Sequence, residues 1–371
     1  MKILMVTPGF YPIKGGTETV VRNLSVELNR RGVLADVMTF NMDRKWNSKW
    51  KGKIEEIDGI KVFKIPGLNW LPIVHSARIT LGVNLIPGRF TNIMKEYDII
   101  HFHEDVSFPL FSFFVKKHKL FQLHGFDANF YKRYHLSRII LKNVADLYIS
   151  ISSRMKKDLM ELGIAKNKIV HLPNGVNTKL FCPQGEKEDD LILFAGRITR
   201  GKGLHVLLKS LDYLKRSVRL VIAGSADWSL TYHQDILRCI KKKNQMGKHK
   251  IEYVGALDQR SIIECYQKAS IVVLPSFMEA FPVVILESLS CETPVIATPV
   301  GGVPEVIRNG DNGLLVPVNN PLKLAEAIQY LLDNEDVRVR LGLEGRKLIE
   351  RSFSLNVIAR KLFSIYTRLL T

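Results

Sequence analysis

The chain has 371 residues, of which 46% are hydrophobic and 24% charged. This balance is typical of globular proteins and excludes intrinsic disorder, and no stretch approaches the roughly 18 uninterrupted apolar residues of a membrane span. Because the chain exceeds the roughly 250 to 300 residues at which one core stops growing, we expect two domains.

Charge is unevenly distributed along the chain. Lys and Arg exceed Asp and Glu by 54 to 36, and residues 1–185 hold 28 basic and 15 acidic residues. Such an excess suits a phosphate-bearing substrate or an anionic membrane surface; no nucleic-acid-binding motif accompanies it, so we expect no nucleic acid partner. The four cysteines form no C-x-x-C pair, which indicates a reduced, cytoplasmic setting.

Apolar strand-like runs alternate with helical stretches along the chain, a pattern typical of parallel sheets covered by helices, so the predicted fold class is α/β. The first series of predicted strands comprises Lys2–Thr7, Ala35–Phe40, Ile60–Ile65, Asp98–His103, Leu120–His124, Asp146–Ile151 and Lys168–Leu172. The second series comprises Leu191–Phe194, Arg219–Ala223, Ile251–Val254, Ile271–Leu274, Pro294–Ala297 and Gly313–Val316.

Helical periodicity predicts helices over Thr17–Arg31 and Ser153–Leu162, and a last one over Leu355–Leu370. A polar segment with Pro and Gly separates the two strand series and indicates a linker. We therefore expect a first domain over 1–178, a linker over 179–190, a second domain over 191–354, and a C-terminal helix within 355–371 that packs back on the first domain.

The segment Phe194–Leu204 combines an apolar strand, a glycine turn and the start of a helix, with Arg197 and Lys202 on either side of the turn. Helix N-termini offer free N–H groups and a partial positive charge. Two added cations predict a site for a diphosphate and for the charge on a departing nucleotide diphosphate. The alternative is a surface turn with two solvated cations. Neither a dinucleotide-binding nor a P-loop glycine motif is present, which disfavours a dehydrogenase or an NTPase.

A second strand, turn and helix follow in Pro275–Glu287. Pro282 suits the first helical turn, so Glu279 falls in the preceding loop and Glu287 inside the helix. We expect Glu279 to accept hydrogen bonds from sugar hydroxyls and Glu287 to bind the paired hydroxyls of a ribose. The alternative is that Glu279 only caps the helix and Glu287 is an exposed helical residue.

In this order and spacing, these two segments resemble the donor site of glycosyltransferase family 4, whose members are retaining enzymes. The resemblance covers most of the chain, and includes the segments Gly15-Gly16-Thr-Glu18, Leu123-His124-Gly125, Pro173–Asn177 and Pro299–Glu305. It implies the GT-B fold, in which two Rossmann-like domains with parallel sheets face a central cleft.

The resemblance implies roles for residues of the second domain. Arg197 and Lys202 would hold the donor diphosphate, Glu279 the donor sugar and Glu287 the ribose. The backbone at Ala280, Phe281, Pro282 and Val283 would approach the sugar and phosphate.

In the first domain, Gly15 and Gly16 would let a loop approach the donor, because glycine has no side chain. His124 would touch the donor sugar or the acceptor, so that the catalytic set becomes His124, Arg197, Lys202 and Glu279. In this family the leaving phosphate is thought to help deprotonate the acceptor on the same face, so no protein base is required.

Two features depart from the family pattern. Members often have Gly where this chain has Ala280 and Pro282, so we expect a reshaped sugar pocket. No D-x-D motif is evident, and Asp189-Asp190 precede a strand. We therefore expect neither a metal ion nor another cofactor, with the two cations acting in place of a metal.

His101 and His103 alternate on a predicted strand and are followed by Glu104 and Asp105. These residue types can ligate a metal. The end of a strand that faces the cleft explains the same pattern, and we favour this interpretation.

The segment Arg44–Lys53 interleaves Trp46 and Trp50 with five cations. Indole rings favour membrane interfaces and cations favour anionic headgroups. The segment predicts peripheral docking at the inner face of a membrane, near a lipid-linked acceptor; the alternative is a solvated loop with two core tryptophans.

The sequence therefore predicts a cytoplasmic, metal-independent hexosyltransferase of glycan biosynthesis. It would transfer a hexose-type sugar from a nucleotide-diphosphate sugar, with retention, to a growing glycan or lipid-linked acceptor. The alternatives are a GT-B nucleotide-sugar epimerase and a non-catalytic, membrane-associated subunit that binds nucleotide.

Overall fold

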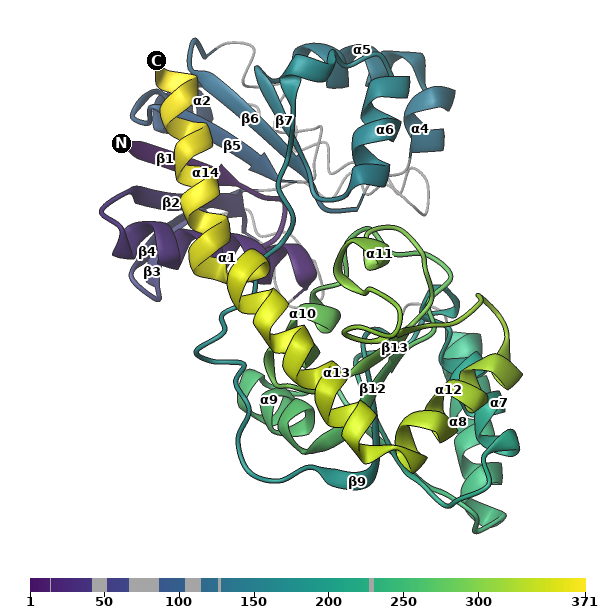
Figure 1. Ribbon diagram of the computed structural model, residues 1–371. Helices are drawn as coiled ribbons and strands as arrows, with labels where there is room; N and C mark the ends of the chain where they lie inside the picture. Colours follow the sequence, from purple (N-terminus) through teal and green to yellow (C-terminus); the bar gives the residue numbers. More distant parts are fainter. Residues whose placement is uncertain (14, 42–51, 67–86, 104–114, 126–127, 227–229) are drawn as a thin grey trace. The chain divides into compact units, whose positions relative to one another are not determined.

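The computed structural model describes residues 1–371 apart from 14, 42–51, 67–86, 104–114, 126–127 and 227–229. Its contacts divide the chain into two compact units, the first comprising Met1–Asn174 and Leu355–Thr371 and the second Gly175–Ser354. Each unit is an α/β body with its own sheet (Figure 1). No helix within the described ranges is long and apolar enough to cross a membrane.

The first unit contains a sheet whose described strands follow the order β3-β4-β2-β1-β5-β6-β7-β8. Neighbouring strands are parallel except at the β3–β4 edge. The central strands are buried on both faces, as expected for a sheet covered by helices. The strands are β1 (Lys2–Val6), β2 (Leu34–Phe40), β3 (Lys53–Ile57), β4 (Ile60–Ile65), β5 (Ile99–His103), β6 (His118–Leu123), β7 (Leu147–Ser150) and β8 (Ile169–His171).

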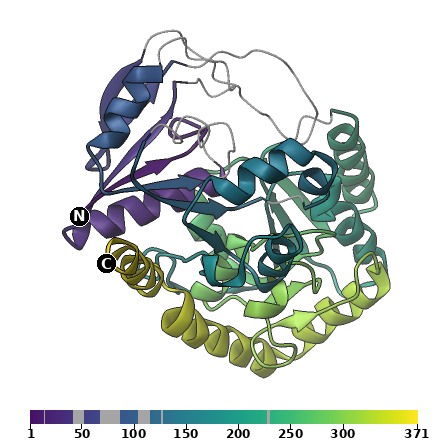
Figure 2. The same cartoon turned by 90° about the horizontal axis from the view of Figure 1, so that it is seen from above.

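The helices described in this unit are α1 (Gly16–Arg30), α2 (Pro87–Lys95), α4 (Ala128–Arg133), α5 (His135–Asn143), α6 (Ser153–Glu161) and α14 (Leu355–Leu370). Ser152 begins α6 by accepting a hydrogen bond from the Met155 amide. The buried side chains of α14 recur at three- and four-residue intervals, so one face of this helix packs on the unit. Helices α1 and α14 lie side by side in Figures 1 and 2.

The second unit contains a parallel sheet in the order β11-β10-β9-β12-β13-β14. Its strands are β9 (Glu188–Ala195), β10 (Arg219–Ala223), β11 (Lys250–Gly255), β12 (Ala269–Leu274), β13 (Val295–Ala297) and β14 (Leu314–Leu315). Its helices are α7 (Leu204–Ser210), α8 (Leu230–Gln245), α9 (Gln259–Lys268), α10 (Val283–Ser290), α11 (Val303–Val306), α12 (Pro321–Asp333) and α13 (Glu335–Leu348). Apolar side chains of β9, β10 and α7 form much of its core.

The α/β class and the two strand series are confirmed. The prediction lacked β3, whose sequence Lys-Ile-Glu-Glu-Ile is charged and half exposed because the strand lies at the edge of the sheet. Strand β9 begins three residues earlier than predicted, at Glu188, because its first residues are polar and partly exposed.

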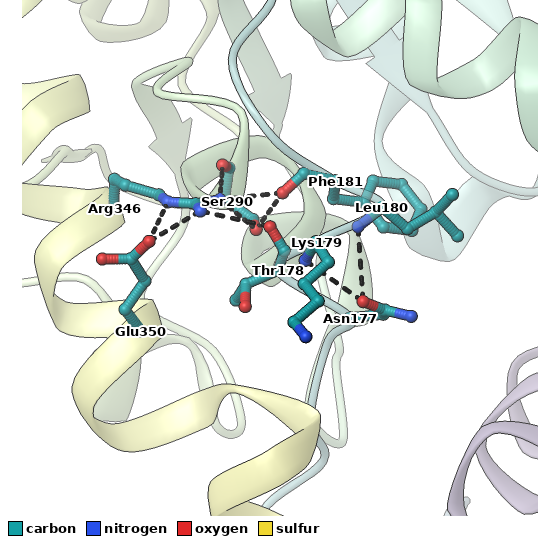
Figure 3. Close-up of polar contacts among 8 residues, drawn as sticks. All are labelled: Asn177, Thr178, Lys179, Leu180, Phe181, Ser290, Arg346 and Glu350. Atoms are coloured by element: carbon teal, nitrogen blue, oxygen red, sulfur yellow. Dashed lines mark hydrogen bonds and ion pairs between the residues drawn. The ribbon is translucent and has the colours of Figure 1, made fainter. Parts of the chain in front are cut away.

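The contact division groups residues 179–190, the expected linker, with the second unit. Arg346 of α13 holds the start of this segment (Figure 3): its guanidinium donates to the carbonyl oxygens of Thr178 and Phe181 at 3.1 and 2.8 Å and pairs with Glu350. Further along, the Lys187 ammonium donates to Thr293 Oγ1 at 2.7 Å and to two carbonyl oxygens.

Strand order indicates where a ligand would bind in each unit. In open α/β sheets, ligands bind outside the carboxyl ends of strands, where the strand order reverses. This reversal falls at β1 and β5 in the first sheet and at β9 and β12 in the second. The loops after these strands carry most of the residues that the motifs singled out.

Candidate functional site

The loops that follow β9 and β12 are locked together by their backbones. The Phe277 amide donates to the Gly201 carbonyl oxygen at 2.8 Å. Gly203 has a φ of 71°, and a Cβ there would lie 2.0 Å from the carbonyl oxygen of Pro275. Glycine is therefore required at 203, both for the left-handed backbone and for the close approach.

A third loop, after β13, packs against the Glu279–Ala280 peptide. The Gly302 amide donates to the Ala280 carbonyl oxygen at 3.0 Å. Gly301 has a φ of 55°, and a Cβ there would lie 1.6 Å from the carbonyl oxygen of Glu279. The glycines of the Pro299–Glu305 turn therefore allow the backbone of the predicted sugar-binding loop to be held in place.

The side chains of Lys202 and Glu279 meet between these loops. Lys202 Nζ lies 2.6 and 2.8 Å from the two carboxylate oxygens of Glu279, and Ser276 Oγ donates to Glu279 Oε1 at 2.7 Å. The Glu279 side chain is 6% exposed and that of Lys202 24%. Removing one partner of such a pair leaves a poorly hydrated charge unpaired. Ser276 was not predicted, although it belongs to the same strand-end segment.

Arg197 is exposed in the loop after β9. Its guanidinium forms no hydrogen bond or ion pair with another residue that the structure describes. Residues Arg200–Lys202 form a short 3-10 turn, and Gly203 precedes the first residue of α7. Arg197 thus remains available to a ligand, whereas the Lys202 ammonium is held by a carboxylate.

Glu287 lies in α10, and its surroundings differ from those of Glu279. Pro282 is the N-cap of α10, immediately before the first helical turn, and Glu287 follows within the helix. The Glu287 carboxylate accepts a hydrogen bond from the buried Tyr266 hydroxyl of α9 at 2.8 Å. Burial raises the pKa of Glu287 to about 7, against the opposite effect of the Tyr266 hydrogen bond. No motif pointed to Tyr266, because its partner is 21 residues away.

Ala280 to Val283 connect the Glu279 loop to α10. Ala280 is half-buried and offers its carbonyl oxygen to Gly302, while the Phe281 and Pro282 side chains are buried. The Phe281 ring packs on Phe353, with 6.0 Å between ring centroids. The segment is thus held by the loop after β13 and by the Phe353 ring.

Gly15 and Gly16 begin α1, in the loop after β1. A Cβ at Gly15 would lie 2.3 Å from a carboxylate oxygen of Glu18, whereas a Cβ at Gly16 would meet no described atom within 4 Å. A side chain at 15 would therefore displace the Glu18 carboxylate, whereas one at 16 would displace no described atom.

His124 follows β6 at its carboxyl end and is buried, as is His103 at the end of β5. His103 Nδ1 lies 2.9 Å from His124 Nε2. Burial lowers the pKa of His124 to about 3. In the described part of the chain, no group of three or more His, Cys, Asp or Glu side chains is arranged to hold a metal ion. Glu104 and Asp105 lie outside the described residues.

A separate hollow of about 250 Å³ lies on the β9–β10–β11 side of the second sheet, beside α9. Its rim carries the Arg219 guanidinium, which pairs with Glu188 and Glu252. None of the predicted donor residues lines this hollow, so we place the candidate site at the loops after β9 and β12, where the motif side chains gather.

Comparisons with known proteins identify the family of the chain. The family description Glycosyltransferase Family 4 matches residues 14–180, and Glycosyl transferases group 1 matches residues 178–348. A curated relative, the O-antigen chain mannosyltransferase C of Escherichia coli, is 25% identical over 100% of this chain and 99% of its own length.

Solved structures show the same fold. The sucrose-phosphate synthase of Thermosynechococcus elongatus superposes with a TM-score of 0.79 at 22% identity, covering 99% of this chain and 98% of its own. HepE of Anabaena, solved in complex with UDP and glucose, has a TM-score of 0.78 at 18% identity, covering 99% of this chain and all of its own. Since the two family descriptions together span residues 14–348 and the fold is GT-B, the chain belongs to glycosyltransferase family 4.

Proposed function

We propose that this glycosyltransferase transfers a hexose-type sugar from a nucleotide-diphosphate sugar to a growing glycan or a lipid-linked acceptor, with retention of the anomeric configuration. The observation that carries the proposal is the Lys202–Glu279 pair at the strand reversal of the second sheet. The UDP and glucose bound to HepE, and the mannosyl transfer named for the Escherichia coli relative, support a nucleotide-sugar donor.

Donor binding would exchange the partners of Lys202. The diphosphate would take the ammonium from Glu279, and the carboxylate, still held by Ser276, would accept hydrogen bonds from hydroxyls of the donor sugar. Exposed Arg197 would add a second cation to the diphosphate. Two cations at the leaving group stabilise its developing charge, so we propose a reaction that needs no metal or other cofactor.

Glu287 would bind the ribose hydroxyls. Its carboxylate already accepts one hydrogen bond, from Tyr266, and a second acceptor oxygen remains for the nucleoside. Because its pKa is about 7, ionisation that favours ribose binding would be reached only near neutral pH.

Residues of the first unit would act on the sugar or the acceptor. Gly15 and Gly16 would let the α1 loop approach the donor, and His124 would bond to a hydroxyl. We propose that the leaving phosphate takes the acceptor proton on the face from which it departs, which is consistent with retention.

The experiment is a thermal-shift screen of the purified protein against UDP, GDP, ADP, dTDP and their common sugar conjugates, without added metal. We expect one nucleotide family to raise the melting temperature, because a ligand that binds only the native state stabilises it. Arg197→Ala should weaken that nucleotide by roughly ten- to a hundredfold, the worth of a hydrogen bond to a charged group.

Arg351→Ala is the matched control, since Arg351 is an exposed arginine of the same unit outside the motifs. No stabilisation by any nucleotide would contradict the proposal. Conversion of the donor to its epimer in the absence of an acceptor would contradict transfer and favour an epimerase.

We also propose that Arg44–Lys53 docks the protein peripherally on anionic lipid at the inner membrane face. The proposal rests on composition, because residues 42–51 lie outside the described ranges. Sedimentation with anionic vesicles at low salt, compared with the variant that carries Trp46→Ser and Trp50→Ser, tests it. Equal sedimentation of the two proteins, or none of the parent, would contradict it.

A further inference from the structure

Four aromatic polar side chains lie one after another in the core of the first unit, in a row that we call the buried file. It runs from Tyr366 of α14 through His101 and His103 of β5 to His124 beyond β6, and none of the four is more than 9% exposed. Tyr366 Oη lies 2.7 Å from His101 Nδ1, the ring centroids of His101 and His103 lie 4.1 Å apart with the rings tilted by 33°, and His103 Nδ1 lies 2.9 Å from His124 Nε2. The file ends beside the strand reversal of the first sheet.

The three imidazoles are neutral near pH 7. Burial lowers the pKa of His101 and of His124 to about 3, and burial together with the neighbouring imidazoles lowers the pKa of His103 well below its usual value. A neutral imidazole has one N–H donor and one bare nitrogen acceptor. Each hydrogen bond of the file therefore restricts the tautomer of the ring that makes it.

The sulfur of Met5 in β1 favours one tautomer of His103. His103 Nε2 lies 3.5 Å from Met5 Sδ. A thioether sulfur can accept a hydrogen bond but cannot donate one. A hydrogen bond across this contact therefore needs His103 Nε2 as the N–H donor, which leaves His103 Nδ1 as a bare acceptor.

The tautomer of His103 in turn sets the tautomer of His124. A bare His103 Nδ1 needs a donor at His124 Nε2, 2.9 Å away. With its proton on Nε2, His124 keeps Nδ1 as a bare acceptor, and this is the ring nitrogen left for any other partner. Hydroxyl groups of a sugar are donors of the required kind.

We propose that His103, oriented by the Met5 sulfur, is a positioning residue that holds His124 in its Nε2–H tautomer and so makes His124 Nδ1 an acceptor for a sugar hydroxyl. The inference rests on the proposed function, because it takes His124 to lie at the transfer site. It adds two residues, Met5 and His103, that no part of that proposal used.

The first test is the tautomer of His124 in the intact protein. Long-range ¹H–¹⁵N correlation spectra of the histidine-labelled chain distinguish protonated from bare ring nitrogens, and the spectrum of a His124→Asn variant identifies the His124 signals. We expect Nε2–H on both His103 and His124 between pH 6 and 8. A proton on His124 Nδ1 would overturn the proposal, whatever the variants do.

The second test removes the constraint. His103→Leu should leave His124 as a mixture of tautomers and lower kcat/KM about tenfold, as expected for one hydrogen bond of ordinary strength. His103→Asn, whose side-chain oxygen can accept the His124 proton, should restore most of the activity. Met5→Leu, which removes the sulfur acceptor, should shift the tautomers in the same direction by a smaller amount.

Tyr366→Phe is the control variant, because the Tyr366 hydroxyl bonds to His101 and contacts neither His103 nor His124. This hydroxyl also lies 3.8 Å from Met5 Sδ, and its removal leaves the sulfur as an acceptor for His103. We expect wild-type tautomers of His124 and wild-type transfer. If Tyr366→Phe lowers activity as much as His103→Leu does, the effect is general to the buried file and the positioning role fails. The role also fails if His103→Leu mixes the tautomers but leaves transfer unchanged.

The kinetics of His103→Leu identify the substrate that His124 contacts. The Michaelis constant of the donor rises if that substrate is the donor, and the Michaelis constant of the acceptor rises if it is the acceptor. Binding of the bare nucleotide diphosphate, which uses residues of the second unit, should be the same in both proteins. Absence of nucleotide binding in the wild type would contradict the proposed function, while the spectra would still decide the tautomer.

Discussion

The two polar clusters of this protein are built in opposite ways. In the second unit, Lys202 and Glu279 form an ion pair held between interlocked loops. In the first unit, His101, His103 and His124 are neutral rings inside a sheet and helix core. Burial can be combined with charge only where an opposite charge is within reach, and otherwise the group stays neutral.

The contrast shows what each cluster can offer a substrate. The charged pair is already satisfied, so an anionic ligand would bind by exchanging partners with it. The neutral rings cannot exchange charge, and they offer a fixed direction of hydrogen bonding instead. An anionic donor suits the first kind of cluster and an uncharged sugar hydroxyl suits the second.

The largest effect should come from breaking the charged pair. Lys202→Met leaves the 6% exposed carboxylate of Glu279 unpaired, so we expect a loss of stability of about 3 kcal/mol and a fall in transfer of roughly a hundred- to a thousandfold. Denaturant unfolding and initial rates measure the two effects.

The double variant Lys202→Met, Glu279→Gln separates the effect on stability from the effect on transfer. It has no unpaired charge, so stability should return while transfer stays low. Recovery of both would show that the pair is only structural, and recovery of neither would show that the loop itself has been displaced.

A substitution in the loop that supports Glu279 should have the next largest effect. Gly301→Ala places a Cβ 1.6 Å from the Glu279 carbonyl oxygen at a φ of 55°, so the loop must shift and donor affinity should fall along with the melting temperature. Gly310→Ala is the matched control: φ is 84°, but no described atom lies within 4 Å of the added Cβ. It should cost only about 1 kcal/mol of backbone strain, and a similar affinity loss in both variants would contradict the role of the loop.

The response of stability to pH should differ in sign between Glu287 of the second unit and His101 of the first. Glu287 has a folded pKa of about 7 against an ordinary 4.5, so the folded state binds the extra proton and its stability falls as pH rises from 4.5 to 7. His101 has a folded pKa of about 3 against an ordinary 6.5, so stability rises as pH rises from 3 to 6.5. Above pH 6.5 the contribution of His101 to stability is fully present.

Melting temperatures between pH 5 and 7.5 test the two signs. Relative to the wild type, Glu287→Gln should gain with rising pH and His101→Phe should lose. Parallel curves for a variant and the wild type would show that the group concerned does not titrate as stated.

The pH dependence of donor affinity offers a related check. Affinity for the nucleotide-sugar should weaken as pH falls below 7, because Glu287 becomes protonated, and Glu287→Gln should be weaker but independent of pH. The intact nucleotide-sugar is the correct ligand, since it lacks a terminal phosphate that titrates in the same range. A pH dependence that persists in the variant would assign the titration to another group.

The smallest effect is expected at Gly16. An added Cβ meets no described atom within 4 Å, so Gly16→Ala should leave the melting temperature unchanged. If the α1 loop approaches the donor, the Michaelis constant for the donor should still rise. An unchanged constant would remove Gly16 from the site and would leave the neutral cluster as the contribution of the first unit.

Much of the fold follows from local pattern. Buried strands such as β1 and β12 are nearly continuous apolar runs, and α14 begins and ends where its helical periodicity predicts. The edge strand β3 was missed because its residues are charged and half exposed, so they carry no apolar signal.

Within the candidate site, the motifs predicted which residues lie at the strand ends. They did not predict which side chains meet. Lys202 and Glu279 are separated by 77 residues, His103 and His124 by 21, and Glu287 and Tyr266 by 21. Such contacts depend on strand order, which hydrophobic periodicity does not encode.

Composition and local pattern thus determine the α/β class, most of the strands and the kinds of side chain that end them, because burial and helical or strand periodicity act over a few neighbouring residues. The pairing of Lys202 with Glu279 and the tautomer of His124 depend on the folded chain. Each requires donors and acceptors from distant segments of the chain to be brought into contact and partly or fully removed from water, and only the packed unit does so.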